Sequence, residues 1–352
     1  MTTKSEAGSI DFRLTTGRKL MWTVLVLALI LATVISLGVG RLPIPISKVV
    51  GLLGSHFVSL ETFWTETDAR VVELIRLPRI LMAVLGGAGL AMAGASLQGI
   101  FRNPLVGPQI IGVSSGASFG GVLAILLFES QVWTISLAFV FGLGAVFIVY
   151  FMSLAGGRSS VLTLVLAGVV TSAFFSALVS LVKYTADPYD KLPAIVFWLM
   201  GSLATITHQK LLIAGVPILL AGTILYLMAF RINVLSLGDE AAEALGVRVE
   251  LNRWVVLVCV TMITSASVAV CGVIGWVGLV VPHIGRMIVG PDHRLLLPAS
   301  GLLGGIYLLI IDDLARALTP AEIPIGIITA VIGAPVFGYL LKRTQAKGWS
   351  GA

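Results

Sequence analysis

Long apolar stretches alternate with short polar ones along almost the whole chain. A helix needs about 20 apolar residues to cross a hydrocarbon core roughly 30 Å thick, because each residue rises about 1.5 Å. The stretches are continuously apolar, whereas the strands of a membrane barrel alternate between apolar and polar residues. The pattern therefore predicts ten membrane-spanning helices, at residues 21–39, 80–100, 110–128, 132–154, 161–182, 211–230, 254–270, 273–289, 295–311 and 325–341.

The composition excludes soluble and disordered classes of protein. Hydrophobic residues make up 57% of the 352 residues and charged residues only 11%, whereas about 25% is typical of a soluble domain. Disorder requires the opposite balance of apolar and charged residues. Two cysteines are too few for a disulfide scaffold. We therefore expect an all-α polytopic membrane protein.

The distribution of basic residues predicts the orientation of the chain. With ten spans both termini lie on one side, and that side carries 14 of the 23 Lys and Arg residues. Cytoplasmic loops are enriched in these residues, so both termini are predicted to be cytoplasmic. The expected organisation is a cytoplasmic segment at 1–20, a transmembrane domain at 21–341 with a polar cytoplasmic loop at about 231–253, and a cytoplasmic tail at 342–352.

The sequence lacks the residue patterns that most enzymes and energy-coupled carriers need. Its four histidines are scattered without the spacing of a zinc site, and no P-loop occurs, so ATP would have to act through another chain. Charged residues are almost absent from the middle of the predicted spans, which argues against an ion-coupled carrier that works alone. No basic run indicates nucleic-acid binding. We predict no catalytic residues and no metal site.

The polar loop between the sixth and seventh predicted spans contains the signals of one short helix. Acidic residues suit its first turn, and a glycine is placed to end it in the left-handed conformation. A cytoplasmic helix this short is explained if it docks into a groove on another protein; the alternative is a surface helix that caps the bundle. The candidate coupling residues are Gly238, Asp239, Glu240, Ala241, Ala242, Leu245 and Gly246.

Three arginines on the predicted outer side run against the positive-inside tendency. Arg76 and Arg79 precede the second span, and Arg316 follows the ninth. Docking of an acidic partner protein would explain them. The alternative is pairing with Asp312, Asp313, Glu322 or lipid headgroups.

Small residues and helix breakers mark where helices pack closely or line a path. Glycine and alanine recur at spacings of three and four within 86–95, which favours close helix packing in lipid. Prolines follow the second span and interrupt the eighth at 282–286; broken helices are tolerated where they pack in protein or line a cavity. A Gly- and Ser-rich pathway is expected, with Ser114, Ser115 and Ser118 as candidate lining residues.

Several of these stretches, in this order, closely resemble the FecCD-type permeases, the membrane subunits of bacterial ABC importers for iron chelates, haem and cobalamin. The resemblance covers nearly the whole chain after residue 40. Its strongest stretches are RLPR at 76–79, QGIFRNPLVGP at 98–108, GVSSGA at 112–117, GLVVPHIGR at 278–286, DHRLLLP at 292–298, EIPIG at 322–326 and GAPVF at 333–337.

The resemblance implies a type II ABC importer permease fold, with ten spans and pseudo-symmetric halves, in the inner membrane. It implies a second permease subunit, most simply a second copy of this chain, and two cytoplasmic ATPases that receive the loop helix and use ATP and Mg²⁺. It also implies a periplasmic or lipid-anchored binding protein that docks on Arg76, Arg79 and Arg316. This chain would bind no cofactor. The substrate would be a ferric siderophore, haem or cobalamin, with molybdate or tungstate as the alternative.

Overall fold

The computed structural model describes residues 3–59, 61–155, 158–319 and 321–345. Parts of the two predicted tails, 1–2 and 346–352, lie outside the described residues. Each of the ten predicted spans is a helix in the structure, so the all-α prediction is confirmed. These helices are α1 (Thr3–Gly38), α4 (Leu77–Ile100), α5 (Val113–Phe128), α6 (Gln131–Ser153), α7 (Val161–Thr185), α9 (His208–Leu227), α12 (Val249–Cys271), α13 (Val277–Val289), α14 (His293–Ala317) and α15 (Ile325–Gln345).

Shorter elements connect these helices. A short π-helical segment, Val71–Arg76, joins α3 to α4. One two-stranded hairpin connects α6 to α7, with Leu154 opposite Ser159. The shorter elements are α2 (Ile46–Ser55), α3 (Glu66–Arg70), α8 (Lys191–Leu199), α10 (Ala229–Leu235), α11 (Asp239–Ala244), β1 (Leu154–Ala155) and β2 (Arg158–Ser159).

Among the described residues, seven helices are long and apolar enough to cross a membrane. Three of the predicted spans correspond to shorter apolar helices, which are α5 (Val113–Phe128), α13 (Val277–Val289) and the part Ile325–Leu340 of α15. The prediction that Pro282 interrupts the eighth span is wrong, because α13 continues through it. The chain does leave the helical conformation at the predicted boundary between the seventh and eighth spans, where Gly272 and Trp276, between α12 and α13, take φ values of +69° and +68°.

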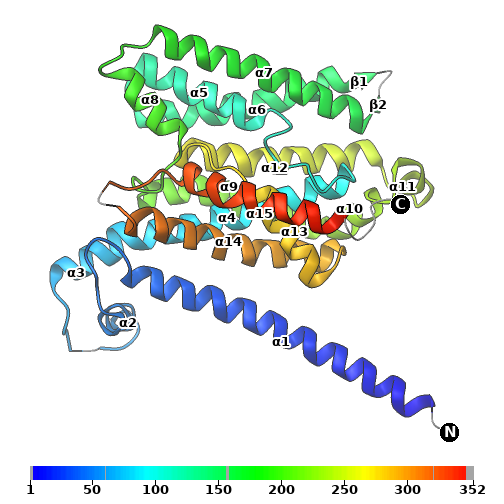
Figure 1. The fold of residues 1–352 in the computed structure, drawn as a ribbon, viewed down its shortest axis with the longest axis horizontal. Coiled ribbons are helices and arrows are strands. Elements are labelled where there is room, and N and C mark those ends of the chain that lie inside the picture. The colour runs from blue at the N-terminus through cyan, green and yellow to red at the C-terminus, as the bar shows by residue number, and fades with distance from the viewer. Residues whose placement is uncertain (1–2, 60, 156–157, 320, 346–352) are drawn as a thin grey trace.

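The helices form two groups that meet along α12 (Figure 1). Helices α5, α6, α7 and α8 lie on one side, and α4, α9, α13, α14 and α15 lie on the other. The C-terminal part of α1 packs against α14, whereas the N-terminal part of α1 lies away from the bundle. Helix α11 lies at the end of the bundle where α1 begins and α15 ends, while α2, α3 and α8 lie at the opposite end.

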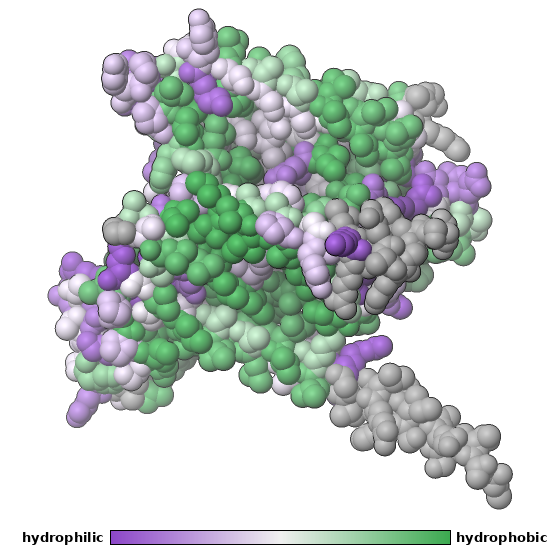
Figure 2. Space-filling view, in the orientation of Figure 1, coloured by the Kyte–Doolittle hydropathy of each residue, from purple (hydrophilic) through white to green (hydrophobic). Residues whose placement is uncertain are grey.

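The surface has the distribution expected of a membrane protein. Figure 2 shows apolar side chains over most of the middle of one face, with hydrophilic side chains gathered towards the two ends. Exposed large hydrophobic residues occur along α1, α6, α7 and α9. In a membrane such residues can contact the lipid directly and need not be buried in protein, so this surface agrees with a chain that spans a bilayer.

Glycines allow α4 to lie directly against its neighbours. A Cβ atom added at Gly87 would lie 2.2 Å from the carbonyl oxygen of Gly304 on α14. One added at Gly94 would lie 1.8 Å from the carbonyl oxygen of Gly278 on α13. The packing role predicted for the small residues of 86–95 is therefore confirmed, since any side chain at these positions would force the backbones apart.

Candidate functional site

Helix α11 forms the tip of the loop that connects α10 to α12. Asp239 and Glu240 occupy its first turn. Gly246 follows its C-terminus with φ +77°, and the N–H of Val247 donates to the carbonyl oxygen of Ala242 at 2.9 Å. The short helix, its acidic first turn and its left-handed glycine are thus as the sequence predicted.

The apolar residues of this loop do not share one exposed face. Ala242 is fully buried against the bundle, whereas Leu245 is 63% exposed and Ala241 is also exposed. Ala242, one of the candidate coupling residues, therefore does not lie on the exposed surface, because the short helix turns one side inwards. Glu240, Ala241 and Leu245 remain as the outward surface, and Ala242 fixes the helix to the protein.

A buried arginine connects α11 to two other elements. Arg253 on α12 is 2% exposed. Its Nη2 lies 2.8 Å from Oδ1 of Asp239, and its Nη1 donates to the carbonyl oxygen of Ser159 at 2.7 Å. A guanidinium presents several donors in a rigid plane, so one side chain can hold the two segments in a fixed geometry.

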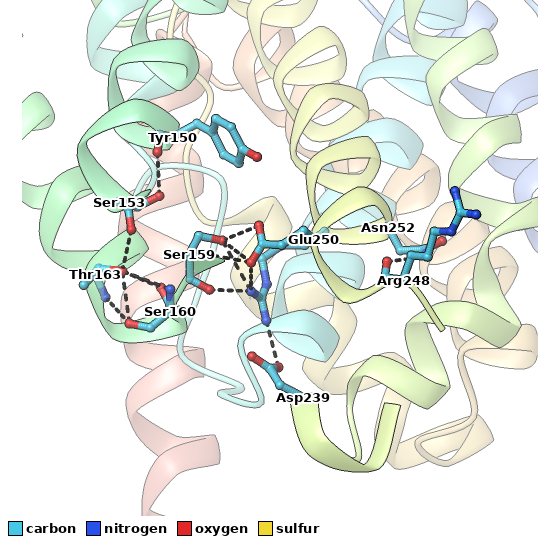
Figure 3. Close-up of polar contacts among 10 residues, drawn as sticks. Tyr150, Ser153, Ser159, Ser160, Thr163, Asp239, Arg248, Glu250 and Asn252 are labelled. Atoms are coloured by element: carbon cyan, nitrogen blue, oxygen red, sulfur yellow. Dashed lines mark hydrogen bonds and ion pairs between the residues drawn. The ribbon is translucent and has the colours of Figure 1, made fainter. Parts of the chain in front are cut away.

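Glu250 completes this cluster. Its carboxylate accepts from the backbone N–H of Ser159 at 2.9 Å and from the Ser159 hydroxyl at 2.9 Å, and it lies 3.3 Å from Arg253. The hairpin between α6 and α7 is thereby fixed to the start of α12 (Figure 3). Sequence reasoning missed this cluster, because Ser159 lies more than 90 residues from both partners. The one local signal is an arginine three residues after a glutamate, at the start of an apolar segment.

Arg79 lies in a buried ion cluster at the opposite end of the bundle. It is 5% exposed. Its Nε lies 3.0 Å from both carboxylate oxygens of Asp312, and Nη1 and Nη2 contact Glu322 at 3.0 and 2.9 Å. Pairing with two carboxylates compensates the buried guanidinium, which would otherwise be strongly unfavourable.

Arg76 and Arg316 bind backbone carbonyl groups where α1 ends. Nη1 of Arg76 donates to the Leu37 oxygen at 2.6 Å, and Nη1 of Arg316 donates to the Val39 oxygen at 2.8 Å. Arg316 also pairs with Asp313, and both arginines are 5% exposed. Pairing with nearby acids, the alternative considered for these arginines, is what the structure contains for Arg79 and Arg316, whereas Arg76 binds backbone carbonyl groups. Docking of a partner on them stays a prediction.

The three candidate pathway serines have different environments. Ser114 lines a cavity of about 130 Å³ between α4, α5, α12 and α13, together with Gln109, Thr264 and Trp276. Ser118 is buried, and its hydroxyl donates to the carbonyl oxygen of Ser114 at 2.7 Å. Ser115 is half-buried and is not one of the cavity's lining residues. Lining of the pathway stays a prediction for all three.

Acidic groups outside the spans are held in their charged form by basic neighbours. The Arg294 side chain lowers the pKa of Asp292 well below its ordinary value, and a hydrogen bond from Asn233 contributes in the same direction. Lys191 lowers the pKa of Glu129 through a hydrogen bond and through its charge. Within the described ranges, no three His, Cys, Asp or Glu residues lie close enough to hold a metal ion.

Comparison with known proteins gives matches over almost the whole chain. A sequence profile of the FecCD transport family matches residues 28–343. The molybdate import system permease protein MolB of Haemophilus influenzae is 46% identical over 92% of this chain and 96% of its own length. The hemin transport system permease protein HmuU of Yersinia pestis is 39% identical over 83% of this chain and 90% of its own length.

The fold is also that of a solved transporter. A chain of a metal-chelate type ABC transporter, in an inward-facing conformation, superimposes with a TM-score of 0.83 and 45% sequence identity. The match covers 92% of this chain and 99% of the solved chain.

Proposed function

Because the chain belongs to the FecCD transport family of ABC importer permeases, we propose that it carries a metal chelate of the ferric siderophore, haem or cobalamin class across the inner membrane. A permease subunit of this kind is not itself catalytic and binds no cofactor. Its task is to provide the path and to change the side on which that path is open. ATP hydrolysis in two cytoplasmic ATPase subunits supplies the energy.

The observation that carries this proposal is the architecture around α11. The helix exposes Glu240, Ala241 and Leu245, which suit a groove on another protein, while Arg253 fixes its first turn to α12 and to the α6–α7 hairpin. A force applied to the exposed surface therefore acts on three elements at once. This geometry supports α11 as the element that receives the ATPase and transmits its movement into the bundle.

A second copy of the chain completes the pathway in this proposal. Helices α7 and α15 belong to different groups of helices, and both expose apolar side chains, among them Val170, Phe174 and Val331. Two copies related by a two-fold axis would place such surfaces against each other. A binding protein would deliver the substrate at the end that carries α2, α3 and α8, around Arg76, Arg79 and Arg316. In this orientation both termini would be cytoplasmic.

A second candidate substrate is a tetrahedral oxyanion of the molybdate or tungstate type. It is favoured by the 46% identity to a molybdate permease over nearly the full length of both chains. Iron-chelate, haem and cobalamin relatives in the same comparison are 37–45% identical. The cavity beside Ser114 is also small, which suits a compact ion better than a large chelate in this conformation.

The proposal is tested by purifying the complex from its native membrane through a tag on this chain. A nucleotide-binding ATPase recovered in equal amount with the permease is the expected result. The binding protein is then isolated, and its bound iron, cobalt, molybdenum and tungsten are quantified by elemental mass spectrometry. Iron or cobalt supports the chelate proposal, and molybdenum or tungsten supports the oxyanion. A solitary chain that transports in vesicles without ATP would contradict both.

A further inference from the structure

A second, larger cavity lies at the end of the bundle opposite α11. Its volume is about 450 Å³, and it is lined by the end of α5, the start of α6, α8, the start of α9 and the end of α12. Apolar side chains such as Ile135, Phe197 and Val270 form much of its wall. A cavity of this size with a few polar groups is typical of a small-molecule site.

Lys210, on the first turn of α9, lines this cavity as a buried cation. The residue is only 9% exposed. Its ammonium group donates one hydrogen bond, to Oγ1 of Thr205 at 3.0 Å, and no carboxylate of the described residues lies within salt-bridge distance. An ammonium has three N–H bonds. The charge and two of these donors are therefore left without an anionic partner among the residues that the structure describes.

The other lysine of this cavity is different. Lys191 pairs with Glu129 and lies 3.9 Å from Asp190. Both acids are well exposed and stand at the cavity's rim. Lys191 balances one of these two negative charges, and neither acid lies within salt-bridge distance of Lys210. A buried charge without a partner is strongly unfavourable, and it persists only where an anion accompanies it; otherwise the group gives up its proton.

Further donors surround the space in front of Lys210. The start of α6 has no side-chain cap from Ser130, so the first N–H groups of that helix lack this partner. Gln131 brings a side-chain amide to the same cavity. Ser202 accepts a hydrogen bond from the Ala204 N–H at 3.1 Å, and its own hydroxyl proton is available. Several donors around one cation match an anion with several oxygen atoms.

We propose that this cavity binds a phosphate-type oxyanion, and that Lys210 is the residue that compensates its charge. The oxyanion is either the headgroup phosphate of a membrane lipid or a free ion from the outer solution, because both present the same oxygens to the site. The apolar wall beside Lys210 accommodates the glycerol portion of a lipid. Among the described residues, the cavity shares no lining residue with the one beside Ser114 and contains none of the three docking arginines.

Binding is measured on the purified full-length chain in detergent, with its co-purifying subunits. Inorganic phosphate is titrated at constant ionic strength while thermal unfolding is followed, because a ligand that binds only the folded state raises the unfolding temperature. Native mass spectrometry on the same protein, reconstituted with phosphatidylglycerol and then stripped, measures retained lipid. A phosphate response alone identifies a free oxyanion, and retained lipid identifies the headgroup.

The variant Lys210→Met removes the charge while keeping the length of the side chain. We expect at least a tenfold weaker phosphate response or lipid retention than in the native protein. Lys183→Met, on α7 at the same end of the bundle and outside the cavity wall, is the matched control and should behave as the native protein does. If the native protein responds to neither probe, or if Lys210→Met binds as well as the control, the proposal is wrong.

Discussion

The carboxylate of Asp239, at the start of the exposed helix α11, lies 2.8 Å from the guanidinium of the almost fully buried Arg253. The Asp239 side chain is 41% exposed, so this pair joins the surface of the loop to the interior of the bundle. The same guanidinium holds the backbone of Ser159. Movement of α11 cannot leave α12 and the α6–α7 hairpin in place without breaking a contact at Arg253.

Replacing Arg253 by lysine tests this connection. Lysine keeps the charge but cannot donate to Asp239 and Ser159 with the same planar geometry. We expect ATP-driven uptake to fall at least about 5-fold, which corresponds to the lower end of the typical range of coupling free energies, about 1 kcal/mol. Arg248→Lys changes an exposed arginine on the same segment and should leave uptake unaltered. Equal uptake by the two variants would remove Arg253 from the coupling path.

The outward surface of α11 is tested with the double variant Glu240→Arg, Leu245→Asp. Both side chains are exposed, so the free energy of unfolding should change by no more than about 0.5 kcal/mol for each substitution. Transport should be abolished while the chain still inserts in the membrane, because the surface offered to the ATPase has changed in charge and polarity. Normal uptake by this variant would contradict the role of α11.

Arg79 is predicted to be required for stability. Removing one partner of a buried ion pair leaves an uncompensated charge and costs about 3–5 kcal/mol, so Arg79→Leu should lower the unfolding temperature sharply. Adding Asp312→Asn and Glu322→Gln removes the carboxylates that Arg79 compensates and should restore part of the loss. If Arg79→Leu unfolds like the native protein and only binding-protein affinity falls, the arginine acts in docking alone.

The contact between α4 and α13 predicts a contrast between two glycines. Gly94→Ala would place a Cβ atom 1.8 Å from the Gly278 oxygen, and overpacking of this kind costs about 1–3 kcal/mol or more. Gly144→Ala on α6 meets nothing within 4 Å and should be neutral or slightly stabilising, since alanine has the higher helix propensity. Thermal unfolding of the two variants in one detergent measures the difference.

Asp292 predicts a dependence of stability on pH. Arg294 lowers its pKa in the folded protein from the ordinary value of 3.8, so the folded state binds this proton less readily than the unfolded state. The stabilisation is complete above the unfolded pKa and is lost as the pH falls through the lower folded value. The stability difference between the native protein and Asp292→Asn should therefore be constant near neutral pH and shrink below about pH 4. A constant difference down to acid pH would contradict the assignment.

The helices could be predicted from the sequence because their signals are local. The length of the apolar stretches predicts the ten helices, and acidic residues followed by a glycine predict the short helix α11. The boundary between the seventh and eighth spans follows from the sequence, but the further interruption predicted at Pro282 is wrong. Trp276, which takes a positive φ at that boundary, carries no sign of it in the sequence. Proline at position 282 is accommodated inside a helix that neighbouring helices surround.

The parts of the site that were missed depend on long-range pairing. Arg253 and Ser159 are 94 residues apart, and nothing in either local sequence specifies the other. Ala242 and Leu245 have similar apolar character, and only tertiary packing decides that one is buried and the other exposed. The same holds for Arg79, whose acidic neighbours were considered in the sequence but whose burial follows from the packing of α4 against α14.

The central claim is that an ATPase engages the outward surface of α11, and a site-specific cross-link tests it most directly. Cys259 and Cys271 are both buried, so a cysteine introduced by Leu245→Cys can be labelled selectively with a photoactivatable maleimide in native membranes. The account predicts an adduct with a nucleotide-binding ATPase, and none from the control Leu220→Cys on the exposed, apolar flank of α9. Equal adducts from both positions, or no ATPase adduct from Leu245→Cys in membranes that still transport, would contradict it.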